Sequence, residues 1–302
     1  MGARLRGRDN KLTNLQLFTA CVAIWGSTWI AITFQLGKVA PEASVFYRFL
    51  LASLLVFAWC AWRKLPLRYS RRQHAWLALM GIFMFSVSYI FVYYAEQHVV
   101  SGLVAVGYSA SPLLGMLGMW AFFGTPMTRR VTVASLLGIA GIALVFWPEF
   151  ARVQGGGSPM LGAIFTALSV ITSTFGSMAA HRNQKEGLPL WQSLAYGMLY
   201  GALFALLWTL AAGRALEFEP TAPYVLSLAY LAVFGSILAF ASYLTLLQRI
   251  GAARAGYIGV MVPIVALVIS AVFESFRWHA LTWVGIAVSV AGNILILREK
   301  RG

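Results

Sequence analysis

Acidic residues are scarce in this chain, and so are charges of any kind. Only nine of the 302 residues are Asp or Glu, and charged residues make up 11% of the sequence. No Asp or Glu lies in the middle of an apolar stretch. The buried acid that proton- or sodium-coupled membrane proteins usually use as a relay or ion ligand is therefore lacking.

Residues that could bind a metal or carry out catalysis are equally few. The two cysteines, Cys21 and Cys60, lie inside apolar stretches and indicate neither a disulfide framework nor a zinc site. The histidines form no set with metal-ligand spacing, so we predict no metal and no cofactor. A membrane protease or lipid transferase would need a Ser-His, paired-Asp, His-rich or HExxH-type set near one membrane face, and we find none.

What the chain has in abundance is long apolar stretches, in a sequence that is 60% hydrophobic. Each is long enough, at 1.5 Å per residue, to cross a hydrocarbon core about 30 Å thick. We therefore predict a membrane protein and number the stretches as spans 1 to 10. They are 15–36, 43–62, 75–95, 99–121, 131–148, 160–181, 190–212, 223–247, 253–273 and 280–297.

Basic residues alternate between the connections that join these spans. The two termini and the even-numbered loops carry 18 of the 23 Lys and Arg residues, the other loops carry four, and Arg48 lies inside span 2. Because positive charge is retained in the cytoplasm, both termini are predicted to be cytoplasmic, in a multi-pass protein of the bacterial inner membrane. The net charge of +14 is explained by this topology, so we expect no nucleic-acid partner.

The ten spans divide into two related halves. A Gly-rich segment, 154–159, separates a first repeat (1–153) from a second (160–302) and is predicted to be a periplasmic linker. At an offset of 151 residues, Gln97 pairs with Gln248, Pro112 with Pro263 and Ala140-Gly141 with Ala291-Gly292. Because each half has five spans, the second crosses the membrane inverted, an arrangement typical of secondary transporters.

The paired prolines lie near the middle of spans 4 and 9. Each removes a backbone donor and leaves the carbonyl of Tyr108 or Gly259 without its helical partner. Proline is often simply tolerated in membrane helices, but two symmetry-related kinks favour a hinge beside a cavity.

Several segments resemble the EamA-type drug/metabolite transporters over about residues 15–298. In the second half these are 251–263 (GAARAGYIGVMVP), Phe273-Glu274, and Val284-Gly285 through Ala291-Gly292. In the first half they are 25–29 (WGSTW), Arg48-Phe49, and Ser101-Gly102 through Ser111-Pro112. One departure is clear, because the family's first repeat usually ends its fourth helix in Gly-Glu, whereas this chain has Phe123-Gly124-Thr125.

The resemblance implies an all-α membrane protein with ten transmembrane helices, in two inverted five-helix repeats around a central cavity. Spans 3, 4, 8 and 9 would form this cavity, with contributions from spans 1 and 6. Family members move small metabolites, frequently amino acids, outward across the inner membrane without an organic cofactor. The aromatic-rich composition is similar to that of the YddG-like exporters of aromatic amino acids.

Polar and aromatic side chains recur at helical spacing along these spans and are candidates for the cavity lining. Their rings could stack on a substrate ring while their hydroxyls bind its polar ends. The alternative is that Ser and Thr bond to their own helix and support close packing. The candidates are Trp25, Thr28, Ser86, Tyr89, Tyr93, Tyr108, Ser111, Ser173, Ser177, Ser236, Tyr243, Tyr257 and Met261.

Three charged residues complete the candidate site. Arg48 could bind a substrate carboxylate in a two-pronged geometry, but it could equally extend outward or bond to helix-end carbonyls or Glu274. Structure is the favoured role, because the resemblance implies this arginine in members with all kinds of substrate. Glu96 and Glu274, at the outer ends of spans 3 and 9, are either gate residues or solvated span ends.

We therefore predict a carrier that exports small amphipathic solutes, with amino acids as the leading class and other metabolites or drugs as the alternative. The missing buried acid favours facilitated or exchange transport. The partners predicted are a small-molecule substrate and the lipid bilayer, with the monomer as the functional unit. A membrane enzyme or a passive channel is the competing class; a channel usually needs oligomers or charged rings, neither of which the sequence shows.

Overall fold

The computed structural model describes residues 12–124, 128–150, 158–255 and 257–297, which form helices and no β-strand. Within this part of the chain, seven helical segments are long and apolar enough to cross a membrane, and three shorter apolar helices make ten. The predicted fold class is confirmed. The elements are α1 Asn14–Thr33, α2 Pro41–Trp62, α3 Arg71–Ile82, η1 Phe83–Val87, α4 Ser88–Glu96, α5 Ser101–Gly107, η2 Tyr108–Ala110, α6 Ser111–Phe123, α7 Arg129–Phe150, α8 Pro159–Lys185, α9 Leu190–Ala211, α10 Ala222–Tyr230, η3 Leu231–Leu238, α11 Ala239–Ala255, α12 Ile258–Phe273 and α13 Ala280–Leu297.

These elements follow the ten predicted spans, with one shifted boundary. Spans 3, 4 and 8 are each built of three elements in succession: α3–η1–α4, α5–η2–α6 and α10–η3–α11. Span 8 continues as helix to Ala255, beyond its predicted end at 247, and span 9 begins only at Ile258. Residues 252–255 (AARA) are strong helix formers, so the helix extends past the apolar stretch.

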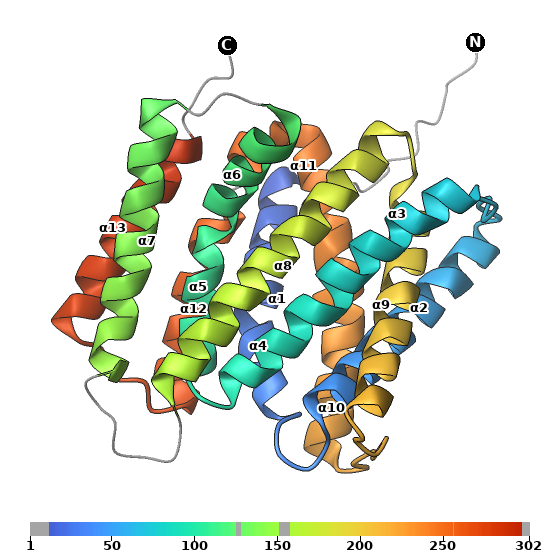
Figure 1. The fold of residues 1–302 in the computed structure, drawn as a ribbon, viewed down its shortest axis with the longest axis horizontal. Helices are drawn as coiled ribbons and strands as arrows, with labels where there is room; N and C mark the ends of the chain where they lie inside the picture. Colours follow the sequence, from blue (N-terminus) through green and yellow to red (C-terminus); the bar gives the residue numbers. More distant parts are fainter. Residues whose placement is uncertain (1–11, 125–127, 151–157, 256, 298–302) are drawn as a thin grey trace, which may run out of the picture.

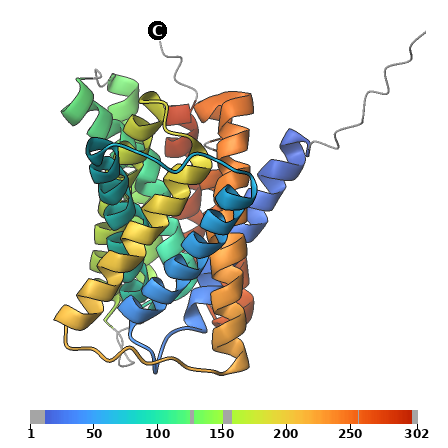
Figure 2. The same ribbon diagram turned by 90° about the vertical axis from the view of Figure 1, so that its right-hand side faces the viewer.

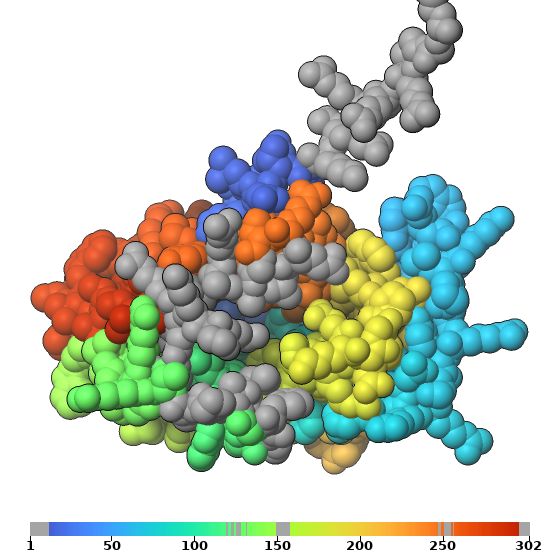
Figure 3. Space-filling model, turned by 90° about the horizontal axis from the view of Figure 1, so that it is seen from above, coloured from blue at the N-terminus to red at the C-terminus, as the bar shows by residue number. Residues whose placement is uncertain are grey.

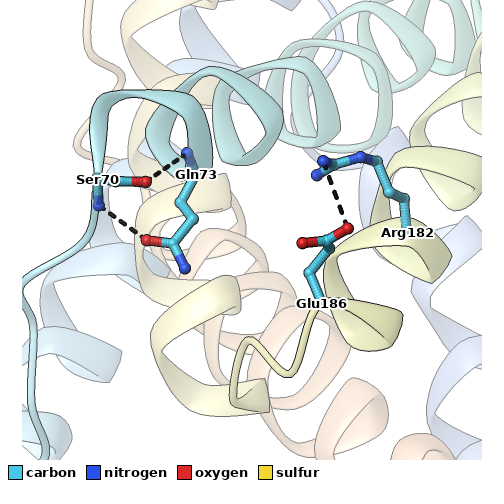
Figure 4. A network of polar contacts seen from close by, with 4 residues as sticks. All are labelled: Ser70, Gln73, Arg182 and Glu186. Atoms are coloured by element: carbon cyan, nitrogen blue, oxygen red, sulfur yellow. Dashed lines mark hydrogen bonds and ion pairs between the residues drawn. The ribbon is translucent and has the colours of Figure 1, made fainter.

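Helix starts are encoded locally. Ser70 forms a capping box at the start of α3, because its hydroxyl accepts the Gln73 N–H at 3.3 Å and the Gln73 side chain accepts the Ser70 N–H at 2.8 Å (Figure 4). Thr13 and Gln16 form the same motif at α1. On the end of α8 that faces α3, Arg182 lies 3.7 Å from Glu186 (Figure 4) and covers the Trp76 ring.

The packing of the helices is symmetric: corresponding spans of the two repeats contact corresponding partners. Span 2 packs on span 7 and span 5 on span 10, so each of these pairs joins corresponding spans. Span 1 packs on spans 8 and 9, as span 6 packs on spans 3 and 4. Figure 1 shows α7 and α13 at one edge, α2 and α9 at the other, and spans 1 and 6 between them; Figure 2 shows the bundle from the α2 and α9 edge.

Both repeats interrupt the same span with wide, π-helical turns. In span 3 this segment is η1, Phe83–Val87, and in span 8 it is η3, Leu231–Leu238. Subtracting the repeat offset of 151 from residues 231–238 gives 80–87, which contains η1. π-helical segments are rare and often lie at functional sites. Because both repeats have one at the same position, the interruption is a property of the repeat.

Close helix crossings occur at the glycines that mark the repeats. A Cβ added to Gly141 of α7 would lie 2.5 Å from the Ser289 nitrogen and 2.6 Å from the Gly285 carbonyl oxygen of α13. A Cβ at the corresponding Gly292 would lie 2.6 Å from the Ala134 carbonyl oxygen. Backbone atoms cannot move aside as a flexible side chain can, so these positions require glycine.

Gly141→Ala is expected to destabilise the protein by about 1–3 kcal/mol, because the new methyl group overlaps the backbone of α13. Gly138→Ala is a matched control one turn earlier on the same helix, where an added Cβ meets nothing within 4 Å. Thermal unfolding in detergent should show a midpoint several degrees lower for Gly141→Ala only. Equal shifts for both variants would contradict the close crossing.

The two faces of the bundle differ in charge. We call the side on which α1 begins and α13 ends the basic side, and the other the opposite side. The α2–α3 connection and the start of α3 lie on the basic side, where Arg63, Lys64, Arg68, Arg71 and Arg72 are all exposed. Figure 3 looks onto this side, and side chains of this segment project from its right-hand edge.

Candidate functional site

Aromatic side chains from spans 1, 2, 3 and 8 meet in the interior of the bundle. The Trp25 ring centroid lies 5.4 Å from that of Tyr243, and its indole N–H donates to the Gly235 carbonyl at 3.2 Å. A row of further ring contacts leads from Trp25 to Tyr89, so three predicted cavity residues belong to one row. Its centroid separations are Trp25–Phe240 5.3 Å, Phe240–Phe85 5.5 Å, Phe85–Phe49 5.4 Å and Phe49–Tyr89 4.9 Å.

Tyr108 connects this row to the polar face of span 6. It lies in η2, its ring centroid is 5.1 Å from that of Trp29, and it interacts with Tyr89. Its hydroxyl interacts with those of Ser88, Ser169 and Ser173. The structure thus brings the predicted residues Tyr108 and Ser173 together, at the level where span 4 is interrupted.

Several residues near the basic side have free space beside them. Ser177, one turn from Ser173 toward this side, is exposed. It lies on the side of α8 opposite to Leu168, Ile171 and Phe175, which are exposed as lipid-facing residues are. A Cβ added to Gly115 of α6 or Gly259 of α12 would meet nothing within 4 Å. We infer that spans 4, 6 and 9 border an opening on the basic side.

On the opposite side, Glu274 joins spans 4 and 9. Its carboxylate accepts the Ser101 N–H at 3.0 Å and the Ser101 and Ser270 hydroxyls at 2.5 Å each. The Ser270 hydroxyl oxygen in turn accepts the Gly102 N–H at 2.9 Å. The end of span 9 therefore satisfies the first two N–H groups of α5, which have no partner within their own helix.

Further buried hydrogen bonds close the same side. The Tyr93 hydroxyl donates to the Gln35 side-chain oxygen at 2.6 Å, which joins span 3 to the end of span 1. Ser44 of span 2 and Tyr224 of span 8 share a hydrogen bond of 2.9 Å, and Tyr94 donates to Glu42. With Glu274, these contacts form what we call the closing layer.

Arg48 lies between the closing layer and the aromatic row, with only 1% of its surface exposed. Its Nε donates to the Ser236 hydroxyl oxygen in η3 at 3.2 Å. Its guanidinium carbon lies 4.5 Å from the Tyr89 ring centroid and 5.1 Å from that of Phe49. In the described part of the chain Arg48 forms no ion pair, and it neither reaches the surface nor binds Glu274.

The two hinge candidates lie in different local structures. Pro112 follows the 3-10 turn η2, and the Tyr108 carbonyl accepts the Ser111 N–H in place of the donor that the proline lacks. Pro263 lies inside α12, which runs through it without interruption. A cavity of about 20 Å³ beside Pro263, between α12, α13 and span 4, has room for about one water.

Comparison with known proteins identifies the family. The EamA-like transporter family matches residues 13–147 and again residues 160–298. The chain belongs to this family. The uncharacterized inner membrane transporter YedA of Escherichia coli (strain K12) is 30% identical over 296 residues, covering 95% of this chain and 92% of that protein.

A second relative and a solved structure agree with this. An uncharacterized transporter in the trpA 3' region of Buchnera aphidicola subsp. Schlechtendalia chinensis is 24% identical, over 87% of this chain and 84% of its own length. A crystal structure of a protein with 17% sequence identity covers 93% of this chain and 95% of its own, with a TM-score of 0.66, and shows that the fold is shared. The protein is thus a multi-pass member of a transporter family.

The family's Gly-Glu ending is missing from the first repeat, and the structure shows what the acid does in the second. Glu274 caps α5, and no acid stands at residues 123–125 to do the same on the basic side. Gly124 there has a φ of +65°, which favours glycine, and Thr125 lies outside the described residues. The two ends of the bundle are therefore held by different contacts.

Met261 lies on an exposed part of α12. It is 39% exposed and shares a helical face with Val268 and Val272, which are 52% and 72% exposed. Val265, one turn after Met261, packs against Gly26 of α1 from the same side of the helix, whereas Leu267, which packs against Gly102 of α5, lies on the other side. Met261 therefore lies beside the contact of α12 with α1.

The remaining candidates take part less directly. The Thr28 hydroxyl donates to the Trp25 carbonyl of its own helix, as the packing alternative predicts. Ser86 is fully buried in η1, and Ser111 and Tyr257 are partly exposed. Glu96 is almost fully buried, which contradicts a solvated span end.

Sequence reasoning missed several residues that the interior depends on. Phe85 and Phe240 link the aromatic row, and Gln35 completes the closing layer. Trp29 and Phe49 were noted only as parts of segments that resemble the family, and not as cavity residues, although each contacts a predicted tyrosine. Phenylalanine carries no signal for the interior in a membrane chain, because lipid-facing helix surfaces are apolar too.

Proposed function

We propose that this protein exports small amphipathic metabolites by alternating access, with neutral and aromatic amino acids as the leading substrate class. Other metabolites or drugs are the alternative within the family. Transport runs down the solute's own gradient or by exchange, since no Asp or Glu lies in the middle of a span. A conformational carrier needs an interior that binds a solute and two ends that open in turn.

The observation that carries this proposal is the matched interruption of spans 3 and 8. Two π-helical segments at corresponding repeat positions bring Ser86 and Ser236 into the buried interior. If the repeats exchange conformations, these segments are where each repeat can bend, as discontinuous helices do in carriers built from inverted repeats.

The closing layer and the opening at Ser177 indicate which side of the protein is open in this conformation. If the basic side is cytoplasmic, as its charge predicts, this conformation receives solute from the cytoplasm and is closed to the periplasm. Both termini would then be cytoplasmic.

Flux into liposomes tests the proposed function against its competitors. Purified protein should give saturable flux of several amino acids, without chemical conversion of the solute. Unsaturable leak would indicate a channel, recovery of a changed product would indicate an enzyme, and flux of other solutes alone would move the substrate class to the alternative.

Tyr108→Ala is expected to weaken aromatic amino acid transport roughly two- to tenfold more than transport of small aliphatic ones, because one ring contact contributes about 0.5–1.5 kcal/mol. Tyr89→Ala should behave alike. Tyr93→Ala should not, since Tyr93 is buried in the closing layer and removing it affects both classes. The apparent KM of each variant for phenylalanine and alanine checks this. Equal losses in Tyr108→Ala would mean that the ring serves packing.

A further inference from the structure

The buried guanidinium of Arg48 has hydrogen-bonding capacity that the protein leaves unused. Its Nε donates a hydrogen bond to Ser236, whereas its Nη1 has no partner among the described residues. The indole N–H of Trp29, whose ring contacts Tyr108, is also buried without an acceptor among the described residues. An isolated charge in such a place is unfavourable unless something pairs with it. The free donors call for an anionic group with more than one oxygen.

Glu96 is the complementary case. Its side chain is 8% exposed at the end of α4, and neither carboxylate oxygen has a hydrogen-bond partner within the described ranges. It lies one turn after Tyr93, whose hydroxyl belongs to the closing layer. Glu274 has three donors of its own, whereas Glu96 has none. A buried carboxylate of this kind calls for a cationic donor.

The two groups belong to one region but do not pair with each other. Arg48 lies against the Tyr89 ring, and Tyr89, Tyr93 and Glu96 follow one another about one turn apart on one face of span 3. A direct contact between Arg48 and Glu96 within 4 Å is absent from the described structure. Because the two groups are apart, neither the guanidinium nor the carboxylate has an oppositely charged partner. A single ligand with one negative and one positive group would pair with both.

We propose that Arg48 binds the carboxylate and Glu96 the ammonium group of an α-amino acid zwitterion. This rests on the proposed function and specifies how the headgroup is recognised. The zwitterion leaves the site electrically neutral, whereas a carboxylic acid alone leaves Glu96 unpaired and an amine alone leaves Arg48 unpaired. The Trp29 N–H is a further donor for the carboxylate.

The substrate side chain would point toward the basic side. Tyr89 lies directly against Arg48 and interacts with Tyr108, which leads to Ser173 and the exposed Ser177. A row of hydroxyls and rings therefore leads from the opening to Tyr89. Tyr89 separates the path from Arg48, so its ring has to turn aside when the headgroup enters.

Matched sets of ligands test the proposal. Each set holds an amino acid, the amine that lacks its carboxylate and the acid that lacks its ammonium group. One set is phenylalanine, phenylethylamine and 3-phenylpropionate; the other is leucine, 3-methylbutylamine and 4-methylpentanoate. Binding to the purified full-length protein is measured by calorimetry for wild type, Glu96→Gln and Arg48→Gln, together with each variant's unfolding midpoint without ligand.

The wild type is expected to bind at least one amino acid roughly tenfold or more tightly than both of its analogues, since each analogue leaves a buried charge unpaired. Glu96→Gln should lose the preference over the acid and keep the preference over the amine, and Arg48→Gln should do the reverse. If Arg48→Gln does not fold, the isosteric Glu96→Gln decides. Equal weakening of all three ligands would assign both residues a structural role and overturn the proposal.

The same measurements separate this proposal from the proposed function. If amino acids show saturable flux but the variants lack the reciprocal headgroup pattern, only the recognition mode is wrong. If the wild type neither binds nor transports phenylalanine or leucine, the substrate class is wrong and the recognition mode is refuted with it.

Discussion

Glu274→Ala is expected to shift the protein toward the conformation that is open on the opposite side. The substitution removes the acceptor of three hydrogen bonds and leaves the Ser101 N–H at the start of α5 without an acceptor. A hydrogen bond to a charged group contributes about 1.5–3 kcal/mol, so even a net loss of about 2 kcal/mol changes the ratio of the two conformations roughly 30-fold. A cysteine in place of the buried Ser44 should then react faster with a membrane-impermeant maleimide.

The exposed Glu217, in the loop between α9 and α10 on the same side, provides the control. Glu217→Ala removes one negative charge without touching the closing layer and should leave the labelling of Ser44→Cys unchanged. If Glu274→Ala labels at the control rate, Glu274 is not part of a gate.

Pro112→Ala is expected to reduce turnover roughly tenfold while leaving the amount of protein in the membrane unchanged. The alanine N–H can donate to the Tyr108 carbonyl and replace the 3-10 turn by continuous helix, which removes the interruption from span 4. Pro263→Ala should have a smaller effect, because α12 is already continuous there.

Initial rates in liposomes, normalised to the protein incorporated, compare the two proline variants. Wild-type turnover in both would mean that the prolines serve only packing. A larger loss in Pro263→Ala would place the hinge in span 9 instead.

The positions of the spans could be predicted from the sequence because the lipid and water on either side constrain which residues can lie where. A span must be apolar over its whole length and the basic residues must collect on one side, so hydropathy and charge together define ten segments. The repeat was also visible, because Gly141 and Gly292 are retained where helix backbones touch.

The π-helical segments could not be predicted, since they arise from tertiary packing. Neither η1 nor η3 contains a proline. In η1 the backbones of Met84 and Phe85 lie close to Gly176 and Gly201, and in η3 Gly235 lies close to the Thr28 side chain. The Ser236 hydroxyl donates a hydrogen bond to the carbonyl of Leu231, five residues earlier. This contact is specific to the π-helical conformation and has no signal in the sequence.

The candidate site was predictable in part. Hydroxyls and aromatic rings at helical spacing led to Trp25, Tyr89, Tyr108 and Tyr243, which do lie in the interior. The place of Met261 stays a prediction, because an exposed apolar side chain suits a lipid-facing surface as well as a cavity. The burial of Glu96 depends on how α4 packs against α2, α5 and α8, which no local pattern encodes.

Cysteine accessibility from the two sides of the membrane tests alternating access most directly. Ser177→Cys reports on the opening and Ser44→Cys on the closing layer, against a low background because Cys21 and Cys60 are buried. An impermeant maleimide applied to inside-out vesicles should label Ser177→Cys, and one applied to intact cells should label Ser44→Cys. Saturating substrate should change the two rates in opposite directions. Rates that change in the same direction, or two cysteines that label from the same side, would contradict the account.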